Sequence, residues 1–343
     1  MKEECHLPLV SVVMPVYNCD AFVGEAVNSV LNQTFQDFEL IIIDDGSTDS
    51  TREVLNGFDD SRINLVFFDK NQGVSKATNE GFRLAKGTYI ARMDGDDISV
   101  RERFEKQVDV LESNPDILIC GSHVKYLGGT NNVIRFKENH NEIITELLVS
   151  CSICMGSSMF RRKALRGYYY DEARRSGEDY EFWTRVAWLG ELYNIQEVLL
   201  LYRVHEKQAS IKHKPQQVID DVDIRLGLFK KLGYDSNHFD DVLLLKLFLL
   251  NKPIEVKEFV LFFKWLKELV LLNSIKKVYP QKEFKEVIKR IKRSLLFSLY
   301  FKNTTIGITK KWRLKALFKL PLQDMIYVLK GKRKEMGKRI LKT

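Results

Sequence analysis

The chain has 343 residues, 45% of them hydrophobic, and its 54 Lys and Arg against 46 Asp and Glu give a net charge of +8. This length and composition support ordinary hydrophobic cores and about two domains, and they exclude a disordered, collagen-like or disulfide-stapled chain. Five cysteines are too few and too unevenly spaced for a disulfide framework, and the opening MKEECHLPLV lacks the apolar core of a signal peptide. We therefore expect a reducing, cytoplasmic compartment.

The charge divides steeply along the chain. Residues 1–210 carry 23 basic and 33 acidic side chains, a net of −10, whereas residues 211–343 carry 31 and 13, a net of +18. The acidic part is expected to hold something positive, such as a metal ion. The basic part is expected to face lipid headgroups, nucleic acid or an anionic substrate. The most apolar stretch, residues 259–272, is interrupted by charges and predicts a buried or interfacial helix, not a membrane span.

Apolar strands and helical patterns alternate over the first 120 residues. The predicted strands are residues 11–17, 38–44, 63–69 and 88–94. We expect Asp20 to cap the first helix, Gly87 to close a helix over residues 78–86, and a capping box at residues 99–102 to open a further helix. This alternation predicts an α/β fold with a mostly parallel sheet flanked by helices.

Acidic and other polar side chains follow the predicted strands at their carboxyl ends, where such sheets bind ligands. They are Pro15, Tyr17 and Asn18 after the first strand, Asp44 and Asp45 after the second, and Asp94, Asp96 and Asp97 after the fourth. Five carboxylates at one edge repel one another unless a cation or hydrogen-bond donors compensate. Because Mg²⁺ and Mn²⁺ bind through one or two carboxylates plus phosphate oxygens, the pattern predicts a site for a metal-chelated phosphate ester. Neither GxxxxGK[ST] nor an early GxGxxG occurs, which disfavours a P-loop NTPase or a nicotinamide-binding protein.

Several motifs follow one another in a fixed order. They are VSVVMPVYN (10–18), FELIIIDDGSTDST (38–51), NQGVSKATNEGF (71–82) and GTYIARMDGDD (87–97), followed by SGEDYEFWTRVA (176–187) and YRVHEKQAS (202–210). In this order and spacing, the first four resemble the nucleotide-binding half of family 2 inverting glycosyltransferases of the GT-A fold, and the last two continue the match. The resemblance implies a catalytic domain over residues 1–214, with a nucleotide-binding half (1–120) and an acceptor-binding half (121–214). It does not reach the helical, basic region of residues 215–343.

The resemblance also implies donor-binding roles. Pro15 and Tyr17 would border the nucleotide base, with Asn18 beside them, and Asp45 would accept the hydrogen bond of a uracil or thymine N3. Asp94 would lie against the ribose. Lys76 is either a diphosphate contact or a solvated lysine.

Metal, catalytic and acceptor roles follow in the same way. Asp96 would ligate a divalent cation, Mn²⁺ or Mg²⁺, and His205 would add a metal or pyrophosphate contact unless it is an ordinary surface histidine. Asp179 would deprotonate the acceptor hydroxyl, although Glu178 and Asp179 could instead be favourable charge in the first turn of a helix. Gly156 and Ser157 stand where the acceptor pocket would begin.

The basic region reads as helices broken near Pro253, Pro280 and Pro321. Apolar stripes run along two of them, one over residues 284–296 and a shorter one made of Trp312, Leu314, Leu317 and Phe318, and lysines and arginines cover the rest. Such helices suit an anionic membrane surface, here through residues 276–343. They could also pack on the catalytic domain with a solvated basic face. Nucleic acid is not expected, because no base-reading motif accompanies the charge.

The sequence therefore predicts a metal-dependent inverting glycosyltransferase that moves a sugar from a nucleoside diphosphate donor, UDP by expectation, to a glycan or lipid-linked glycan hydroxyl. Cell-surface polysaccharide synthesis at the inner face of the plasma membrane would suit that chemistry. Two alternatives are a sugar nucleotidyltransferase and a non-catalytic subunit that binds a nucleotide sugar.

Overall fold

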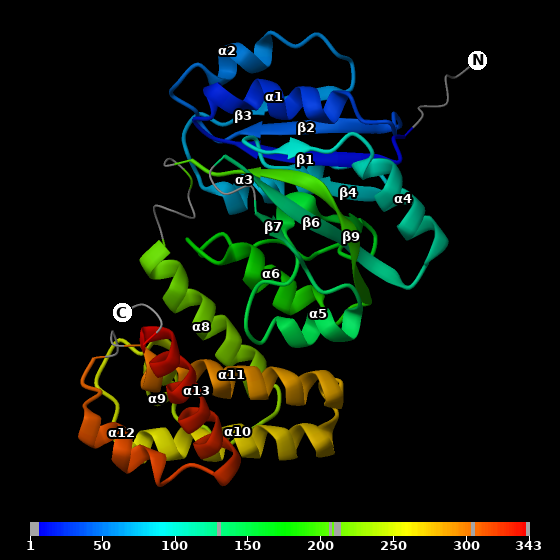
Figure 1. Cartoon of the computed structure of the whole chain (residues 1–343). Helices are drawn as coiled ribbons and strands as arrows, with labels where there is room; N and C mark the ends of the chain where they lie inside the picture. Colours follow the sequence, from blue (N-terminus) through cyan, green and yellow to red (C-terminus); the bar gives the residue numbers. More distant parts are fainter. Residues whose placement is uncertain (1–6, 129–131, 206–207, 209–213, 303–305, 341–343) are drawn as a thin grey trace. The chain divides into compact units, whose positions relative to one another are not determined.

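The computed structural model describes residues 7–128, 132–205, 208, 214–302 and 306–340. The chain divides into two compact units, Met1–Gln217 and Val218–Thr343. The first unit is an α/β unit and the second is helical, as the ribbon shows (Figure 1).

The first unit is a curled sheet with helices packed on it (Figure 1). Its strands are β1 (Val10–Val16), β2 (Phe38–Asp44), β3 (Ile63–Phe67), β4 (Tyr89–Arg92), β5 (Ile98–Ser99), β6 (Ile117–Leu127), β7 (Val133–Ile134), β8 (Met159–Arg161) and β9 (Glu191–Arg203). Its helices are α1 (Asp20–Leu31), α2 (Thr51–Asn56), α3 (Val74–Leu84), α4 (Arg103–Ser113), α5 (His140–Glu146), α6 (Glu178–Val186) and the 3-10 turn η1 (Met155–Ser157).

The order of the strands places the predicted ligand-binding loops together. The sheet runs β3-β2-β1-β4-β8-β6-β9-β5, with β7 paired to β6. The four strands β3, β2, β1 and β4 are parallel, as predicted, while β8 is antiparallel to both of its neighbours. Because β2, β1 and β4 are adjacent and parallel, the loops at their carboxyl ends open on one edge of the sheet.

Helices cover the apolar strands closely. Every residue of β1 is buried, and α1 turns its Val23, Ala26, Val27 and Val30 face into the same core. On α3, a Cβ at Gly81 would lie 2.3 Å from a methyl of Val13, so only glycine lets this helix approach the strand so closely.

Three predicted helix boundaries are wrong. Asp20 is the first residue of α1 and the cap position is Cys19, which makes no side-chain cap. The helix α3 ends at Leu84, and Gly87 is instead the point where the chain passes tightly against Ser11. Residues 98–99 form strand β5, because Ser99 pairs with Leu200 of β9 and its hydroxyl accepts a hydrogen bond from Gln33. A tertiary pairing thus replaces the predicted capping box.

The second unit consists of helices joined by short turns. They are most of α8 (Lys214–Lys230), α9 (Asp241–Leu249), α10 (Val256–Lys276), α11 (Gln281–Phe301), α12 (Lys310–Leu317) and α13 (Leu322–Ile340). The breaks at Pro253, Pro280 and Pro321 are confirmed. The stripe on α11 is also confirmed, since Phe284, Val287, Ile288, Ile291, Leu295 and Leu296 are all buried. Trp265 of α10 is fully buried at the centre of an aromatic cluster.

The second predicted stripe, on α12, is not buried as a whole. Trp312 packs against Phe259 of α10, with ring centroids 5.5 Å apart, but Leu314 and Phe318 remain exposed. None of the helices that the structure describes is long and apolar enough to cross a bilayer.

Candidate active site

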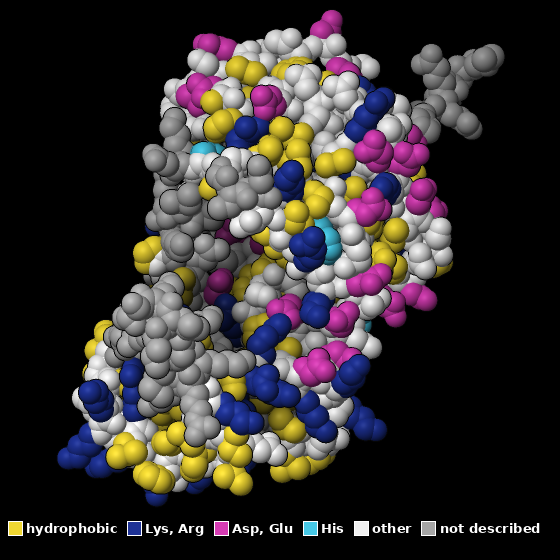
Figure 2. Space-filling model, in the orientation of Figure 1, with side chains coloured by type: hydrophobic (Ala, Val, Ile, Leu, Met, Phe, Trp, Pro, Cys, Tyr) yellow, Lys and Arg dark blue, Asp and Glu magenta, His cyan; other side chains and the backbone are white. Residues whose placement is uncertain are grey.

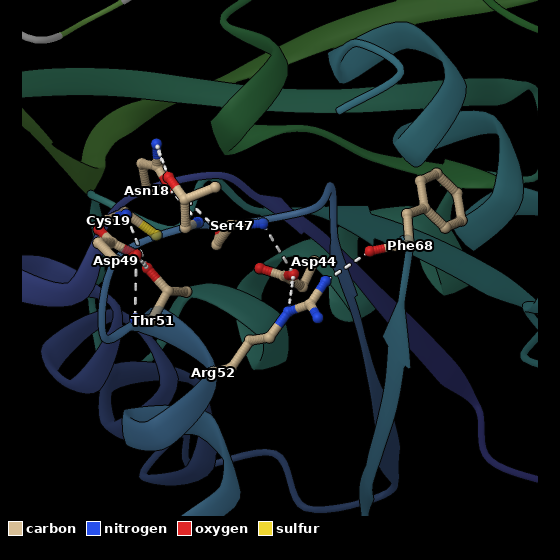
Figure 3. Close-up of polar contacts among 9 residues, drawn as sticks. Asn18, Cys19, Asp44, Ser47, Asp49, Thr51, Arg52 and Phe68 are labelled. Carbon is tan, nitrogen blue, oxygen red and sulfur yellow. Dashed lines mark hydrogen bonds and ion pairs between the residues drawn. The ribbon is translucent and has the colours of Figure 1, made fainter. Parts of the chain in front are cut away.

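The loops after β1 and β2 are joined by side-chain hydrogen bonds (Figure 3). The side-chain oxygen of Asn18 accepts a hydrogen bond from the backbone amide of Thr48 at 2.8 Å. The backbone amide of Asn18 donates to the Ser47 hydroxyl at 2.9 Å. Asn18 has a left-handed backbone with φ 48°, which asparagine tolerates better than most residues. It therefore ends β1 in a fixed turn, beside which the ring of Tyr17 is 47% exposed and Pro15 is buried within the strand.

Asp44 does not need a cation to balance its charge. Its carboxylate is buried, accepts from Arg52 Nε at 2.8 Å and accepts from the Ser47 amide at 3.1 Å (Figure 3). The guanidinium of Arg52 also donates to the carbonyl of Phe68. Of the two kinds of compensation expected for these carboxylates, a cation or hydrogen-bond donors, Asp44 has the second, from Arg52 and the Ser47 amide.

Asp45 binds the loop that precedes α3. One carboxylate oxygen accepts from the Gln72 amide at 2.7 Å and the other from the Gly73 amide at 2.8 Å. Burial raises the pKa of Asp45, although the two hydrogen bonds act to lower it. A carboxylate has about four acceptor positions, so two remain for a ligand. Lys76, on the first turn of α3, donates to the Gln72 side chain at 2.6 Å.

The turn after β4 holds three carboxylates, each with a different partner. Asp94 pairs with Arg92 at 2.9 Å, Asp96 lies 3.0 Å from His205 Nε2, and Asp97 accepts from the Arg203 amide at 2.9 Å. Burial, together with the charge of Asp94, raises the pKa of Asp96. Burial, together with the charges of Asp94 and Asp96, raises the pKa of Asp97 to about 9.

The side chain of His205 is held in place by α1. Its ring lies 4.7 Å from that of Phe22, centroid to centroid. The guanidinium of Arg203 also stacks on the Phe22 ring, and it donates a hydrogen bond to the Asp96 carbonyl at 2.9 Å. The end of β9 and the acidic turn are thus joined although they are more than 100 residues apart.

Gly156 lies against the acidic turn. A Cβ at this position would stand 2.6 Å from Asp94 Oδ2 and 3.4 Å from Asp97 Oδ2, so η1 can approach these carboxylates only through a glycine. Ser157, like Gly156, is buried, and its hydroxyl donates to the Cys154 carbonyl at 3.0 Å. The hydroxyl of Ser157 is thus engaged within η1, and its predicted contact with the acceptor stays a prediction.

Asp179 occupies the first turn of α6, next to Glu178. The Tyr170 hydroxyl donates to Asp179 Oδ1 at 2.8 Å, and the amide side chain of Asn79 fixes the Tyr170 backbone through two hydrogen bonds. Burial first, and the neighbouring Glu178 second, raise the pKa of Asp179 to about 7. Such a carboxyl group is poised to exchange a proton near neutral pH.

The buried Arg92 joins the acidic turn to α6. Its guanidinium pairs with Asp94 and interacts electrostatically with Asp179 and Tyr170. Sequence reasoning missed both Arg92 and Tyr170. A charged residue within the apolar strand YIAR is a usable signal for Arg92, whereas nothing in the run of tyrosines at residues 168–170 distinguishes Tyr170.

The pair formed by Asp96 and His205 fits a divalent cation that takes its other ligands from a substrate. Mg²⁺ and Mn²⁺ use one or two carboxylates together with phosphate oxygens and water. Within the described ranges no group of three or more acidic, histidine or cysteine side chains could hold a metal alone. Asp97 Oδ2 is buried without a hydrogen-bond partner among the described residues, so positive charge beside this turn would be favourable.

Comparisons with known proteins identify the family and the fold. The model of glycosyl transferase family 2 matches residues 11–168. An uncharacterized glycosyltransferase of Haemophilus influenzae is 31% identical over 279 residues, which are 76% of this chain and 86% of that protein.

Two solved structures share the fold. S. aureus TarS 1–349 in complex with UDP-GlcNAc has a TM-score of 0.57 at 16% identity, over 88% of this chain and 97% of that one. The mannosyltransferase PcManGT from Pyrobaculum calidifontis, in complex with GDP-Man and Mn²⁺, has a TM-score of 0.50 at 14% identity, over 95% and 87%. The α/β unit is therefore of the GT-A type, and with the sequence matches this establishes that the chain is a glycosyltransferase that belongs to glycosyl transferase family 2.

Proposed function

We propose that this protein is a metal-dependent, inverting glycosyltransferase that moves a sugar from a UDP-linked donor to a hydroxyl of a glycan or lipid-linked glycan. The observation that carries the proposal is the buried Arg92, which pairs with Asp94 at 2.9 Å and whose pKa is raised, against the effect of burial, by the charges of Asp94, Tyr170 and Asp179. The guanidinium of Arg92 therefore links two parts of one site. These are the turn after β4, which suits a nucleotide diphosphate, and the carboxyl group of Asp179, which suits proton transfer. We assign transfer to residues 1–214, with the donor bound by residues 1–120 and the acceptor by 121–214.

In this proposal the loops at the sheet edge bind the nucleotide. Asp45 uses its free acceptor positions for the N3 proton of uracil, and the exposed ring of Tyr17 lies on the base above the strand end at Pro15. Asn18 supports these contacts by fixing the turn. Asp94 contacts the ribose. The two related structures with UDP-GlcNAc and GDP-Man support a nucleotide-sugar donor as the ligand class.

Asp96 and His205 would hold Mn²⁺ or Mg²⁺ together with oxygens of the donor's diphosphate. The bound cation would offset the negative charge that develops on the departing diphosphate, a contribution of several kcal/mol in metal-assisted reactions. The Mn²⁺ in the PcManGT complex supports this assignment. Lys76, at the start of α3, would add a second positive charge on the diphosphate side.

Asp179 is the proposed base. It takes the proton of the acceptor hydroxyl while that oxygen forms a bond to the anomeric carbon, and the bond from this carbon to the phosphate oxygen breaks with its electron pair leaving on UDP. Attack from the face opposite UDP inverts the anomeric centre. A positioned base accelerates such a reaction about 10² to 10⁴-fold. Glu178 and Gly156 border the acceptor in this arrangement, because they lie beside Asp179 and Asp94 respectively.

Release of UDP from nucleotide sugars, with and without acceptor glycans and with Mn²⁺, Mg²⁺ or EDTA, tests the proposal. For Asp179→Asn we expect unchanged donor affinity by calorimetry and transfer lowered by at least about 10²-fold. Asp171→Asn, an exposed carboxylate in the same segment, is the matched control. Retained transfer in Asp179→Asn would remove the base from its role. Pyrophosphate as the product would indicate a nucleotidyltransferase, and donor binding without any turnover would indicate a non-catalytic subunit.

The acceptor and the place of action form the outer part of the proposal. Residues 276–343 hold 21 basic and 4 acidic side chains. A surface of that charge is attracted to anionic lipid, each nearby Lys or Arg contributing about 1 kcal/mol. Attachment there through residues 276–343 would bring the enzyme to an acceptor carried on a membrane lipid.

A further inference from the structure

Five large aliphatic or aromatic side chains are exposed where the chain passes from α12 to α13. They are Leu314 (57% exposed), Phe318 (70%), Leu322 (70%), Ile326 (40%) and Leu329 (48%). We call them the apolar face. Their spacing of three and four residues within each helical segment places them on one side of that segment. Single exposed apolar residues are common, but five on two consecutive segments, each set on one side of its own segment, indicate a binding surface.

The opposite sides of the same segments are already used for packing. Ala316, Leu320 and Val328 are buried, and Trp312 contacts Phe259 of α10. Residues 314 and 316 of α12 differ by two positions, about 200° around a helix, and so do the exposed Ile326 and the buried Val328 of α13. The exposure of the apolar face therefore does not result from loose packing, because each segment has a separate buried side.

The charges around the apolar face are positive. Lys310, Lys311, Lys315, Lys319 and Lys330 are exposed, and α12 contains no acidic residue. Asp324 of α13 is buried and paired with Lys292 at 2.8 Å, so it does not weaken this field. Figure 2 shows hydrophobic side chains gathered with lysines and arginines on the second unit, in the lower part of the view.

We propose that the apolar face inserts into the headgroup boundary of an anionic bilayer while the surrounding lysines bind lipid phosphates. The inference rests on the membrane attachment proposed above and assigns it to particular residues. Large apolar side chains bordered by cations match an anionic lipid interface. There the apolar side chains contact the lipid tails, and the cations bind the phosphates. Nucleic acid would use the lysines but gives the exposed leucines nothing to bury against.

Sedimentation of the full-length protein with vesicles tests this assignment. With phosphatidylserine and phosphatidylcholine vesicles, Phe318→Ser with Leu322→Ser should lower the partition coefficient about 10- to 100-fold, since binding scales with buried apolar area. The matched control is Leu189→Ser with Val242→Ser, which removes two exposed apolar residues that have acidic neighbours, Glu191 and Asp241. Equal loss in both variants, or no loss in the first, would overturn the proposal.

A second measurement needs no variant. At about 1 M salt the Debye length falls to about 3 Å, which screens the lysines. Wild-type protein should keep part of its vesicle binding there, whereas complete release would show attraction by charge alone and refute insertion. If light scattering without lipid showed that the Phe318→Ser and Leu322→Ser variant separates a dimer into monomers, a second copy would be the occupant and the proposal would fall.

Transfer to a soluble acceptor, measured on the same preparations, separates this proposal from the proposed function. We expect the apolar-face variant to keep its UDP release while losing vesicle binding. Lost vesicle binding with intact transfer supports the membrane face. Intact vesicle binding in a protein without transfer activity would contradict only the proposed reaction.

Discussion

Replacing Tyr170 by phenylalanine tests how the proposed base is held. The hydroxyl of Tyr170 donates to Asp179 at 2.8 Å, and its ring stacks on Phe182 with centroids 4.9 Å apart. Phenylalanine keeps the stacking and removes the hydrogen bond. The change therefore isolates one contact of the carboxylate.

The size of the effect follows from the strength of that bond. A hydrogen bond to a charged group contributes about 1.5–3 kcal/mol, and 1.36 kcal/mol corresponds to one pKa unit. The hydrogen bond lowers the pKa of Asp179, which is about 7 in the intact site, so its loss should raise that pKa by about one to two units. At pH 7 the ionised fraction would fall from about one half to about 1–10%, and transfer would fall about 5- to 50-fold.

The sign of the pH dependence distinguishes this mechanism from a merely structural defect. A base acts when ionised, so activity is lost as pH falls through its pKa, and the acidic limb of the pH–rate profile should move to higher pH in Tyr170→Phe. Activity should recover as the pH is raised towards 9. UDP release between about pH 6 and 9 measures this, with the neighbouring Tyr169→Phe as control. An acidic limb that stays in place or moves to lower pH would refute the reasoning.

Three further substitutions test the nucleotide, metal and acceptor parts of the site. Asp45→Ala should weaken UDP binding in calorimetry and lower stability, since the Gln72 and Gly73 amides each lose a hydrogen bond that contributes about 0.5–1.5 kcal/mol; unchanged affinity would contradict its role. His205→Ala should raise the Mn²⁺ concentration for half-maximal transfer at least about tenfold, and an unaltered metal titration would remove it as a partner of Asp96. Gly156→Ala places a Cβ 2.6 Å from Asp94 Oδ2, so transfer should fall at least about tenfold. Thermal unfolding should show a loss of stability of about 1–3 kcal/mol from overpacking. Full activity would show that the turn after β4 can move away from the added methyl group without loss of function.

Local sequence patterns determined most of the first unit's sheet. The strand of residues 38–44 is found with the predicted bounds, because a continuous apolar run between turn residues has few other stable conformations. The common edge of Asp45, Asp94 and Asp96 also follows from the pattern, since adjacent parallel strands must end on the same side. These features depend on periodicity and chain direction, which a single sequence contains.

Contacts between distant segments were decided by the tertiary structure alone. Arg52 neutralises Asp44 locally, but the charges of Asp179 and Tyr170 act on Arg92 only once the first unit has folded, since about 80 residues separate them in the chain. The capping box near Ser99 was predicted from good local signals and is overridden by pairing with β9, a hundred residues later. On α12, helical spacing predicted an apolar stripe, yet its burial depends on whether a neighbouring helix covers each side. Sequence periodicity specifies which side chains share a face, whereas the partner of that face is set by long-range packing whose energy no local window contains.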